Sequence, residues 1–269
     1  MKVWFITGAS RGFGRIWAEA ALGRGDAVVA TARNPDDLMG LAPQADPDRL
    51  KILRLDVTDR AGVFAAFAEA VAQFGRIDVV ISNAGYGHVG MVEEITEDEA
   101  RAQMESNFFG TLSVLQAALP HLRARRSGHL IAVSSIGGIT ALPALSLYCA
   151  SKWAVEALCE SLAAEVRDFG IHVTLLEPAG YATSFAGSSS QHSSPLPAYA
   201  DAHAQRADRH GRIVWADPQP TAGAVLELVD MAKPPLRLLL GKTAHDRVRQ
   251  AHAAREADWE RYRDLTAQG

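Results

Sequence analysis

Short runs of Val, Ile and Leu alternate along the chain with longer stretches in which apolar residues recur at helical spacing. This alternation is typical of a parallel β-sheet that is covered by helices on both faces. The sequence therefore predicts an α/β fold with a doubly wound, seven-stranded parallel sheet. The pattern predicts strands near residues 2–7, 27–32, 50–55, 77–82, 128–134, 171–176 and 236–240, and helices near 13–23, 60–74, 97–125, 147–169 and 219–231.

Two stretches depart from this rhythm. Residues 180–217 are rich in serine and histidine and show no strand period, which predicts a long, mobile loop. Because this loop follows the sixth predicted strand, we expect an active-site lid rather than a disordered excursion. Residues 243–265 mix Arg, Asp, Glu and Ala at helical spacing and predict a solvated helical extension. No linker or repeat divides the chain, so residues 1–269 are expected to form a single domain.

The composition narrows the range of partners. A net charge of -4 leaves no broad basic surface for a phosphate backbone, so no nucleic-acid partner is expected. No stretch approaches the roughly 20 apolar residues that span a bilayer, and no signal peptide is apparent, so a cytoplasmic protein without a membrane partner is expected. Cys149 and Cys159 are too far apart in one predicted helix to form a disulfide, which indicates a reducing compartment. The nine histidines are scattered, and no metal site is expected.

A glycine-rich turn joins the first predicted strand to the first predicted helix, with Gly8, Gly12 and Gly14 in the segment 7–14. Residues without a Cβ let the backbone turn tightly and approach a pyrophosphate, whose charge is met by amides at a helix N-terminus. Such glycines can also end a strand for steric reasons alone. The strand, turn and helix near the N-terminus nevertheless favour a dinucleotide site.

The end of the second predicted strand indicates which dinucleotide binds. NAD needs a carboxylate for its ribose hydroxyls, whereas NADP presents a phosphate that favours arginine. This strand ends at Ala32 without an acidic residue, Arg33 follows it, and Arg11 in the glycine turn is a second cation. We therefore expect NADP(H), because two ordinary surface arginines would leave the missing carboxylate unexplained.

Tyr148 and Lys152 are four positions apart in a predicted helix, which places their side chains on one face. A free tyrosine has a pKa of about 10, but an adjacent ammonium and a nicotinamide cation stabilise the phenolate and are expected to lower the pKa of Tyr148. Tyr148 then becomes a usable acid or base. The same spacing also arises by chance, with a tyrosine packed on a lysine stem, so the pair needs support from other positions.

Further polar residues lie at predicted strand ends. Ser134 and Ser135 follow the strand near 128–134, where open α/β sheets bind ligands and where a hydroxyl can hold a carbonyl oxygen. Asn83 ends the strand near 77–82, and Asn107 interrupts a helical stretch in which asparagine is mildly unfavourable. Either serine could equally cap a strand or a helix, so none of these residues is convincing by itself.

Together these features resemble the short-chain dehydrogenase/reductase family from residue 2 to about residue 240. A spacing of thirteen between the serine and the tyrosine selects Ser135 over Ser134. The family motifs are met by T-G-x-x-x-G-x-G at 7–14, Asp56, N-A-G at 83–85, Asn107, Ser135 and Y-x-x-x-K at 148–152.

Two positions depart from the family pattern by small-residue exchanges. Ser82 replaces the first asparagine of N-N-A-G, and Ala179 stands between Pro178 and Gly180 where the family has Pro-Gly. The pattern at 177–185 and the extended C-terminus are similar to the hydroxysteroid and retinol dehydrogenase-like branch.

The resemblance implies a Rossmann-type fold, NADP(H) as the cofactor and four catalytic residues. Ser135 would hold the substrate carbonyl oxygen, Tyr148 would supply the proton, and hydride would come from the nicotinamide. Lys152 would lower the pKa of Tyr148 and hold the nicotinamide ribose, and Asn107 would anchor a water in a proton relay. Together with Tyr148 and Lys152, the implied cofactor-binding residues are Gly8, Ser10, Arg11, Gly12, Phe13, Gly14, Arg33, Asp56, Val57, Asn83, Ala84, Gly85, Pro178, Ala179, Gly180 and Thr183.

The expected function is an NADPH-dependent carbonyl reductase or alcohol dehydrogenase. The predicted pocket walls at 87–94, 136–145 and 181–217 are largely small and apolar, which suggests a ketone or secondary alcohol of moderate bulk. Two alternatives stay open, a non-catalytic NADP-binding regulator and an NAD-linked dehydrogenase that works in the oxidative direction. The helices near 97–125 and 147–169 resemble the pair through which the family assembles, so a homodimer or homotetramer is expected.

Overall fold

A seven-stranded, wholly parallel sheet forms the centre of the computed structural model, which describes residues 1–44, 46–183 and 189–266. The strands follow the order β3-β2-β1-β4-β6-β7-β9, so the order reverses beside β1 and the fold is doubly wound, as predicted. Open sheets of this kind bind ligands at that point of reversal. The strands are β1 Val3–Thr7, β2 Ala27–Ala32, β3 Leu50–Arg54, β4 Val79–Ser82, β6 Gly128–Val133, β7 Ile171–Pro178 and β9 Arg237–Leu240.

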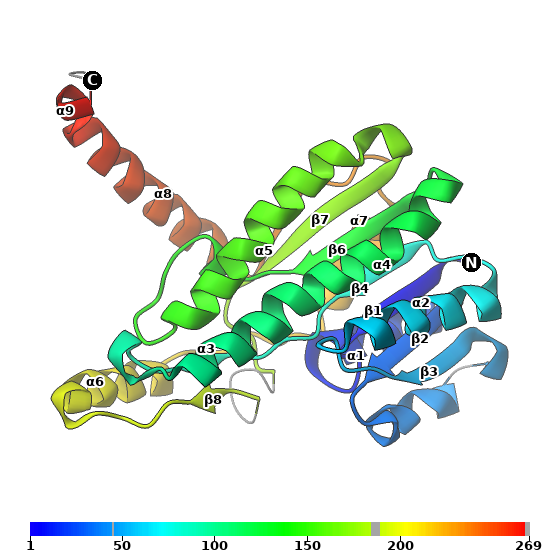
Figure 1. The fold of residues 1–269 in the computed structure, drawn as a ribbon, viewed down its shortest axis with the longest axis horizontal. Helices are drawn as coiled ribbons and strands as arrows, with labels where there is room; N and C mark the ends of the chain where they lie inside the picture. The colour runs from blue at the N-terminus through cyan, green and yellow to red at the C-terminus, as the bar shows by residue number, and fades with distance from the viewer. Residues whose placement is uncertain (45, 184–188, 267–269) are drawn as a thin grey trace.

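Helices cover both faces of the sheet (Figure 1). Because successive strand residues point to opposite faces, Phe5 of β1 packs in one core while Trp4 and Ile6 pack in the other. Phe5 stacks on Phe67 of α2, with ring centroids 4.0 Å apart. One face carries α2 Arg60–Phe74, α4 Gly110–Arg125 and α5 Ser146–Glu165, and the other carries α1 Gly12–Gly23 and α7 Thr221–Asp230.

The helix predicted near 97–125 is interrupted. It divides into α3 Glu97–Met104, a π-helical turn Glu105–Phe109 and α4. Thr96 caps α3 by accepting a hydrogen bond from the Glu99 amide at 3.3 Å. The interruption contains Asn107, the residue that already looked out of place in the sequence, and such π turns are frequent at functional sites.

The prediction of a structureless loop over 180–217 is wrong for much of this stretch. Strand β8 Gln191–His192 pairs in parallel with β5 His88–Val89, and helix α6 spans Ala200–Gly211. No residue of α6 is buried, so the helix has no apolar stripe for a periodicity argument to detect. Residues 184–188 of the predicted lid lie outside the described residues.

The predicted C-terminal extension is helical, with α8 Ala244–Arg261 and α9 Arg263–Thr266. It projects away from the sheet (Figure 1), and Ala244 is the buried residue of α8. Arg255 attaches α8 to the body, because its guanidinium lies 5.0 Å from the Trp153 ring centroid and donates to the Ile139 carbonyl at 2.9 Å. Among the described residues, no helix is long and apolar enough to cross a membrane.

Candidate active site

The glycine turn has the geometry that the sequence predicts for a pyrophosphate. Gly8 and Gly12 have φ angles of +66° and +57°, a region that side chains with a Cβ rarely adopt. A Cβ on Gly14 would lie only 2.4 Å from the Gly8 carbonyl oxygen. Helix α1 begins at Gly12 without a side-chain cap, so its first amides are available to an anion. This turn therefore fits a dinucleotide.

The N-A-G segment is fastened directly to that turn. Thr7 Oγ1 accepts hydrogen bonds from the amides of Asn83 and Ala84 at 2.9 and 3.0 Å. The Asn83 side chain donates to the carbonyls of Thr7 and Gly8 at 3.0 and 3.1 Å. Thr7 was absent from the predicted set, although its place as the last residue of β1 could have indicated this role. These bonds fix two loops that follow neighbouring strands into one surface.

The two arginines that are predicted to meet the NADP phosphate are both exposed. Neither Arg11 nor Arg33 forms an ion pair with a residue in the described ranges, whereas Arg15 pairs with Glu19 at 2.8 Å. Asp56 Oδ1 accepts hydrogen bonds from its own turn, from the Thr58 amide and hydroxyl. Val57 packs closely on Gly110 of α4. Of the residues predicted here, the two arginines are therefore the ones that remain free to meet a phosphate.

Residues 178–183 return to the same edge of the sheet. The Ala179 amide donates to the Leu240 carbonyl at 2.8 Å, and the Trp215 ring packs against Gly180. Thr183 lies beside Gly12, because a Cβ there would be 3.6 Å from the Thr183 Cβ. Residues 178–183 and the glycine turn can therefore contribute to one site, as the prediction requires.

Phe13 and Ser10 also belong to the predicted cofactor-binding residues of the glycine turn. The Phe13 ring stacks on Trp17 and meets Tyr181 edge-on, with ring centroids 5.1 and 5.2 Å apart. The Phe13 ring therefore packs against Trp17 and Tyr181 rather than facing a ligand. Ser10 lies in the turn itself and is half-buried.

Tyr148 and Ser135 meet inside the protein. The Tyr148 side chain is buried and its hydroxyl is hydrogen-bonded to Ser135. The Ser135 hydroxyl also accepts a hydrogen bond from the Gly137 amide at 3.0 Å, which fixes its orientation. A Cβ on Gly137 would lie 3.2 Å from the tyrosine ring, so the glycine allows this approach. The structure thus brings the predicted serine and tyrosine together.

Lys152 lies beside this pair. Its ammonium is 5.9 Å from the centroid of the Tyr148 ring and donates to the Val133 carbonyl at 2.8 Å. Burial lowers the pKa of Lys152 to about 8, and the negative charge of Glu156 opposes that effect. Burial raises the pKa of Tyr148 above its ordinary value, against the hydrogen bond from Ser135. The expected fall in the Tyr148 pKa is therefore absent from the protein alone.

Asn107 is fully buried and holds three partners. Its amide nitrogen donates to the Tyr86 carbonyl at 3.1 Å and to the Ser151 hydroxyl at 3.0 Å. Its oxygen accepts from the Tyr86 amide at 3.1 Å. A Cβ on Gly85 would lie 2.9 Å from that oxygen and 3.7 Å from the Lys152 ammonium. Asn107 therefore joins the N-A-G loop to α5 beside Lys152.

Two residues of this network were missed by sequence reasoning. Ser151 is fully buried between Asn107 and the Tyr148 carbonyl, to which it donates at 2.7 Å. Thr111 donates to the Asn107 carbonyl at 2.9 Å and accepts from Ser82 at 3.2 Å. Ser82, noted as a departure from the family pattern, thus connects to the Asn107 turn.

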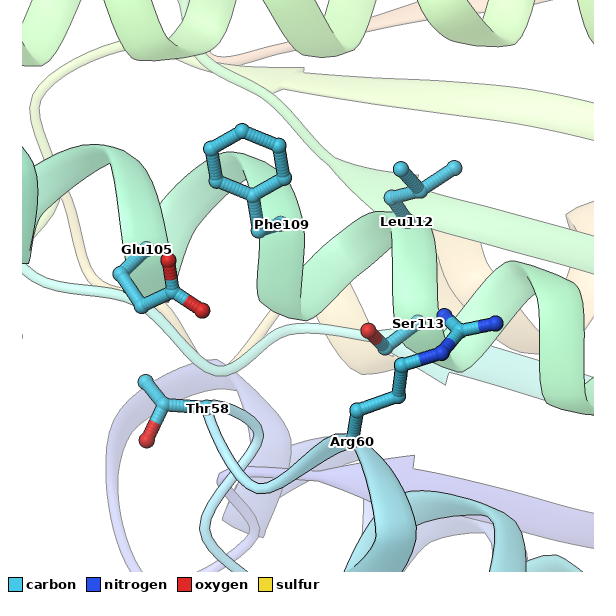
Figure 2. A pocket seen from close by; sticks show the side chains of 6 residues that line it. All are labelled: Thr58, Arg60, Glu105, Phe109, Leu112 and Ser113. Atoms are coloured by element: carbon cyan, nitrogen blue, oxygen red, sulfur yellow. The ribbon is translucent and has the colours of Figure 1, made fainter.

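A surface hollow on the outer side of α4 is separate from this site. Figure 2 shows its lining by the side chains of the β3–α2 connection and of the interrupted helix. It contains no residue of the predicted catalytic or cofactor set; its lining residues are Thr58, Arg60, Glu105, Phe109, Leu112 and Ser113. Within the described part of the chain, no cluster of three or more potential ligands could hold a metal ion.

A doubly wound parallel sheet with a glycine turn at its point of reversal, and with a half-buried serine and a buried tyrosine and lysine beside it, defines a dinucleotide-dependent oxidoreductase. The comparison with protein families agrees. The model of the family described as short chain dehydrogenase matches residues 2–194, and the chain belongs to this family. It is thus an enzyme that acts on CH–OH or C=O groups.

Curated relatives support the assignment. The chain is 43% identical to "Oxidoreductase BOA17" of Botryotinia fuckeliana, over 98% of both chains. It is 35% identical to a 3-ketodihydrosphingosine reductase of Bacteroides thetaiotaomicron, over 89% of this chain and 88% of the relative. Human 17-beta-hydroxysteroid dehydrogenase type 1 is 43% identical over 52% of this chain and 42% of its own length, which fits the predicted branch.

Solved structures share the fold. A short-chain dehydrogenase from Streptomyces avermitilis is 38% identical, with a TM-score of 0.92 over 100% of this chain and 99% of its own. An alcohol dehydrogenase from Thermococcus sibiricus holds 5-hydroxy-NADP; it is 28% identical, with a TM-score of 0.73 over 89% and 96% of the two chains. A Burkholderia phymatum family member holds NAD; it is 26% identical, with a TM-score of 0.81 over 96% and 95%. Both nicotinamide dinucleotides thus occur among these neighbours.

Proposed function

We propose that this chain is an NADPH-dependent carbonyl reductase that reduces an uncharged, largely apolar ketone to a secondary alcohol. The observation that carries the proposal is the buried Tyr148 hydroxyl, hydrogen-bonded to Ser135 with the Lys152 ammonium beside its ring. Because burial raises the pKa of Tyr148, this hydroxyl keeps its proton at neutral pH. A reduction requires a proton donor, and this protonated phenol can supply the proton.

The proposed cofactor is NADP(H). The exposed cations Arg33 and Arg11 support it, because β2 ends without a carboxylate and neither arginine is paired with another described residue. The glycine turn and Thr183 would hold the pyrophosphate side, and Pro178 to Gly180 would border the nicotinamide. When bound, the reduced nicotinamide supplies hydride.

The side chains of the site have distinct tasks in this proposal. Ser135 donates a hydrogen bond to the substrate carbonyl oxygen, and Tyr148 gives that oxygen a proton as negative charge develops. Lys152 stabilises the phenolate that remains, and Asn107 anchors the water through which the proton is replaced. The apolar side chains Val89, Ile136 and Ile139 are buried near the site, which supports an apolar substrate.

The segment 189–217 is proposed to cover the substrate. Its strand β8 pairs with β5, which follows the N-A-G loop. The Bacteroides relative is named for reduction of a keto group and the human relative for a hydroxysteroid, and both names fit a bulky apolar carbonyl.

A panel of ketones tests the proposal, scored by NADPH consumption with Tyr148→Phe as the blank. We expect turnover of at least one apolar ketone in the wild type and a loss of about 100-fold or more in the variant. If NADPH binds but no ketone is reduced, and Tyr148→Phe leaves the cellular effect of the protein unchanged, the non-catalytic regulator is favoured instead.

The cofactor choice is tested separately by titrating NADPH and NADH against the wild type and Arg33→Asp. The wild type is expected to prefer NADPH, and the variant to lose about tenfold or more of that preference, because the replaced cation meets the extra phosphate. Equal affinity for the two cofactors in the wild type would contradict NADP(H) and support the NAD-linked dehydrogenase.

Assembly and location complete the proposal. Phe109, the last residue of the π-helical turn before α4, and Trp153 of α5 are large aromatic residues that are 47% and 39% exposed, and they support a homodimer or homotetramer formed through α4 and α5. Sedimentation measurements of the wild type and Trp153→Glu test this assembly, which the charged variant should weaken. Both cysteines are buried free thiols, which supports a reducing, cytoplasmic location.

A further inference from the structure

A cluster of buried charged residues lies directly behind Lys152. Glu156 follows Lys152 by one turn of α5, and Glu177 lies near the end of β7. Their side chains are 8% and 1% exposed. Arg237 of β9 serves both, with its Nε 3.2 Å from Glu156 Oε2 and 3.5 Å from Glu177 Oε1. Two buried carboxyl groups thus share one guanidinium, whose side chain is itself partly exposed.

The two carboxyl groups need a proton between them. Both approach the same Arg237 Nε, at 3.2 and 3.5 Å, and an ionised carboxylate can only accept hydrogen bonds. Glu156 Oε1 and Glu177 Oε1 are both buried without a donor among the described residues. Arg237 is also bound by Glu160 at 2.6 Å, so one positive charge faces three carboxyl groups. Two ionised carboxylates at this place would repel each other strongly.

The proton belongs mainly to Glu177. Burial, with the charge of Glu156, raises the pKa of Glu177 to about 8. Burial raises the pKa of Glu156 as well, but Ser134 and the charge of Arg237 oppose it. At neutral pH the pair therefore carries one negative charge, and this charge is centred on Glu156.

This negative charge acts on Lys152. The Lys152 ammonium is buried, and the opposing influences that favour its charged form come from Glu156 first and then from Cys159. Burial raises the pKa of the Cys159 thiol to about 12, so the thiol is neutral and contributes no charge. The groups that face the cluster from the elements around it are Lys152, Cys159 and Glu160 of α5, Arg237 of β9 and Ser134 after β6.

We propose that Glu156 and Glu177 form a buried carboxyl pair that shares one proton, and that its single negative charge keeps the Lys152 ammonium charged. The two glutamates are positioning residues, since they act on the reaction through Lys152. This inference rests on the proposed function only for the task that it gives to Lys152. Glu177 keeps the pair from acquiring a second charge, and Glu156 supplies the charge that Lys152 meets.

Titration of the lysine side chains by NMR tests the pair without any turnover. The chain has five lysines, and a Lys152→Met sample identifies the Lys152 signal. Glu156→Gln is expected to lower the measured pKa of Lys152 by about one unit, because it removes the adjacent charge. Glu177→Gln is expected not to lower it, because Glu156 then stays ionised. Glu160→Gln is the matched control, since this exposed glutamate contacts Arg237 from solvent and should leave Lys152 unchanged.

Two results would overturn the proposal. One is a Lys152 pKa that Glu156→Gln does not lower, and the other is an equal fall in Glu156→Gln and Glu177→Gln, which would indicate a merely structural role. Glu156→Asp, which keeps a carboxylate, should restore part of the wild-type value. Should the glutamine variants fail to fold, infrared spectra of the wild type still decide the matter, because a protonated carboxyl band must be present at neutral pH and must disappear as the pH rises past about 8.

Failure of the inference and failure of the proposed function give different results. If Glu156→Gln lowers the pKa of Lys152 as expected but no ketone is reduced, the carboxyl pair is supported and the proposed function is contradicted. If ketones are reduced but Glu156→Gln does not change the pKa of Lys152, the proposed function is supported and the proposed carboxyl pair is contradicted. When both stand, the alkaline limb of the pH profile for reduction should move to lower pH in Glu156→Gln and stay in place in Glu160→Gln.

Discussion

The two sides of the candidate site are built from different chemistry. On the cofactor side, Thr7, Gly8 and Asn83 are joined by short hydrogen bonds between neutral groups, most of which involve the backbone. On the substrate side, the segment 189–217 is attached to the body by carboxylates. The first side should therefore respond to changes of backbone shape, and the second to changes of charge.

Glu94 is the centre of the attachment on the substrate side. Its buried carboxylate accepts hydrogen bonds from His203 Nε2 at 2.7 Å and from the amides of Leu196 and Met91 at 2.9 and 2.7 Å. A second contact uses Ser193, which donates to Glu99 at 2.9 Å and lies 2.8 Å from His88 Nε2. One buried carboxylate thus holds Met91, the turn after β8 and α6 together.

The largest effect is expected from Gly14→Ala. The new Cβ would meet the Gly8 carbonyl oxygen at 2.4 Å, so the turn must open, at a cost of at least about 3 kcal/mol, or about 100-fold in NADPH affinity. Fluorescence titration with NADPH measures the change. Gly23→Ala, in the same helix but with open space around the new Cβ, should bind NADPH normally. Equal binding by Gly14→Ala and wild type would contradict a backbone-built cofactor side.

A smaller effect is expected from Asn107→Ala, which removes the link between the two sides. The substitution leaves the Tyr86 amide and the Ser151 hydroxyl without their Asn107 partner, while the Tyr86 carbonyl keeps its bond from Gln103, and we expect the free energy of unfolding to fall by about 2 kcal/mol. Urea unfolding measures this fall, and ketone turnover should decrease with it. The exposed Asn34→Ala serves as the control. A fully stable Asn107→Ala variant would show that the loop is held by other contacts.

The cofactor side was readable in the sequence because its constraints are local. The sequence directly shows the glycines that permit positive φ, the threonine that ends the first strand and the absence of an acidic residue after Ala32. The Tyr148 and Lys152 spacing is equally local, and the structure places the Lys152 ammonium 5.9 Å from the centroid of the Tyr148 ring. The seven strands were predictable for the same reason, since each is a short run rich in Val, Ile, Leu or Ala.

The remaining features depend on contacts across the chain. Helix α6 has no buried residue, so its sequence carries no apolar period and its position depends on His203 meeting Glu94, 109 residues away. The pairing of Glu156 with Glu177 likewise joins α5 to β7, which no spacing rule connects. The raised pKa of Tyr148 could not be predicted either, because burial outweighs its neighbours. Sequence patterns therefore predicted the elements better than the charges between them.

A third prediction addresses the substrate side. Glu94→Gln keeps the shape of the side chain but removes the charge that accepts three hydrogen bonds, so the segment 189–217 should open more often. We expect the KM for the ketone to rise about fivefold, with NADPH affinity unchanged, and limited proteolysis to cut the segment faster. The exposed Glu97, whose carboxylate pairs with Arg101 of the same helix and not with the segment, provides the control Glu97→Gln. A loss of NADPH affinity in Glu94→Gln would show that the two sides are not independent.

The smallest effect is expected on the Tm when the pH is lowered, and it acts through the Glu94 carboxylate. Burial opposes the ionisation of Glu94, but the hydrogen bonds from His203 and from the amides of Leu196 and Met91 outweigh burial and lower its pKa from 4.5 to about 2. A pKa that is lower in the folded protein means that the ionised group stabilises the fold fully above pH 4.5, and that this contribution is lost as the pH falls towards 2. The difference in Tm between wild type and Glu94→Gln should thus be constant near neutral pH and shrink below pH 4.5, since the other titrating groups are common to both proteins. A difference that stays unchanged down to pH 3, or that grows, would mean that the charge of Glu94 does not hold the segment 189–217.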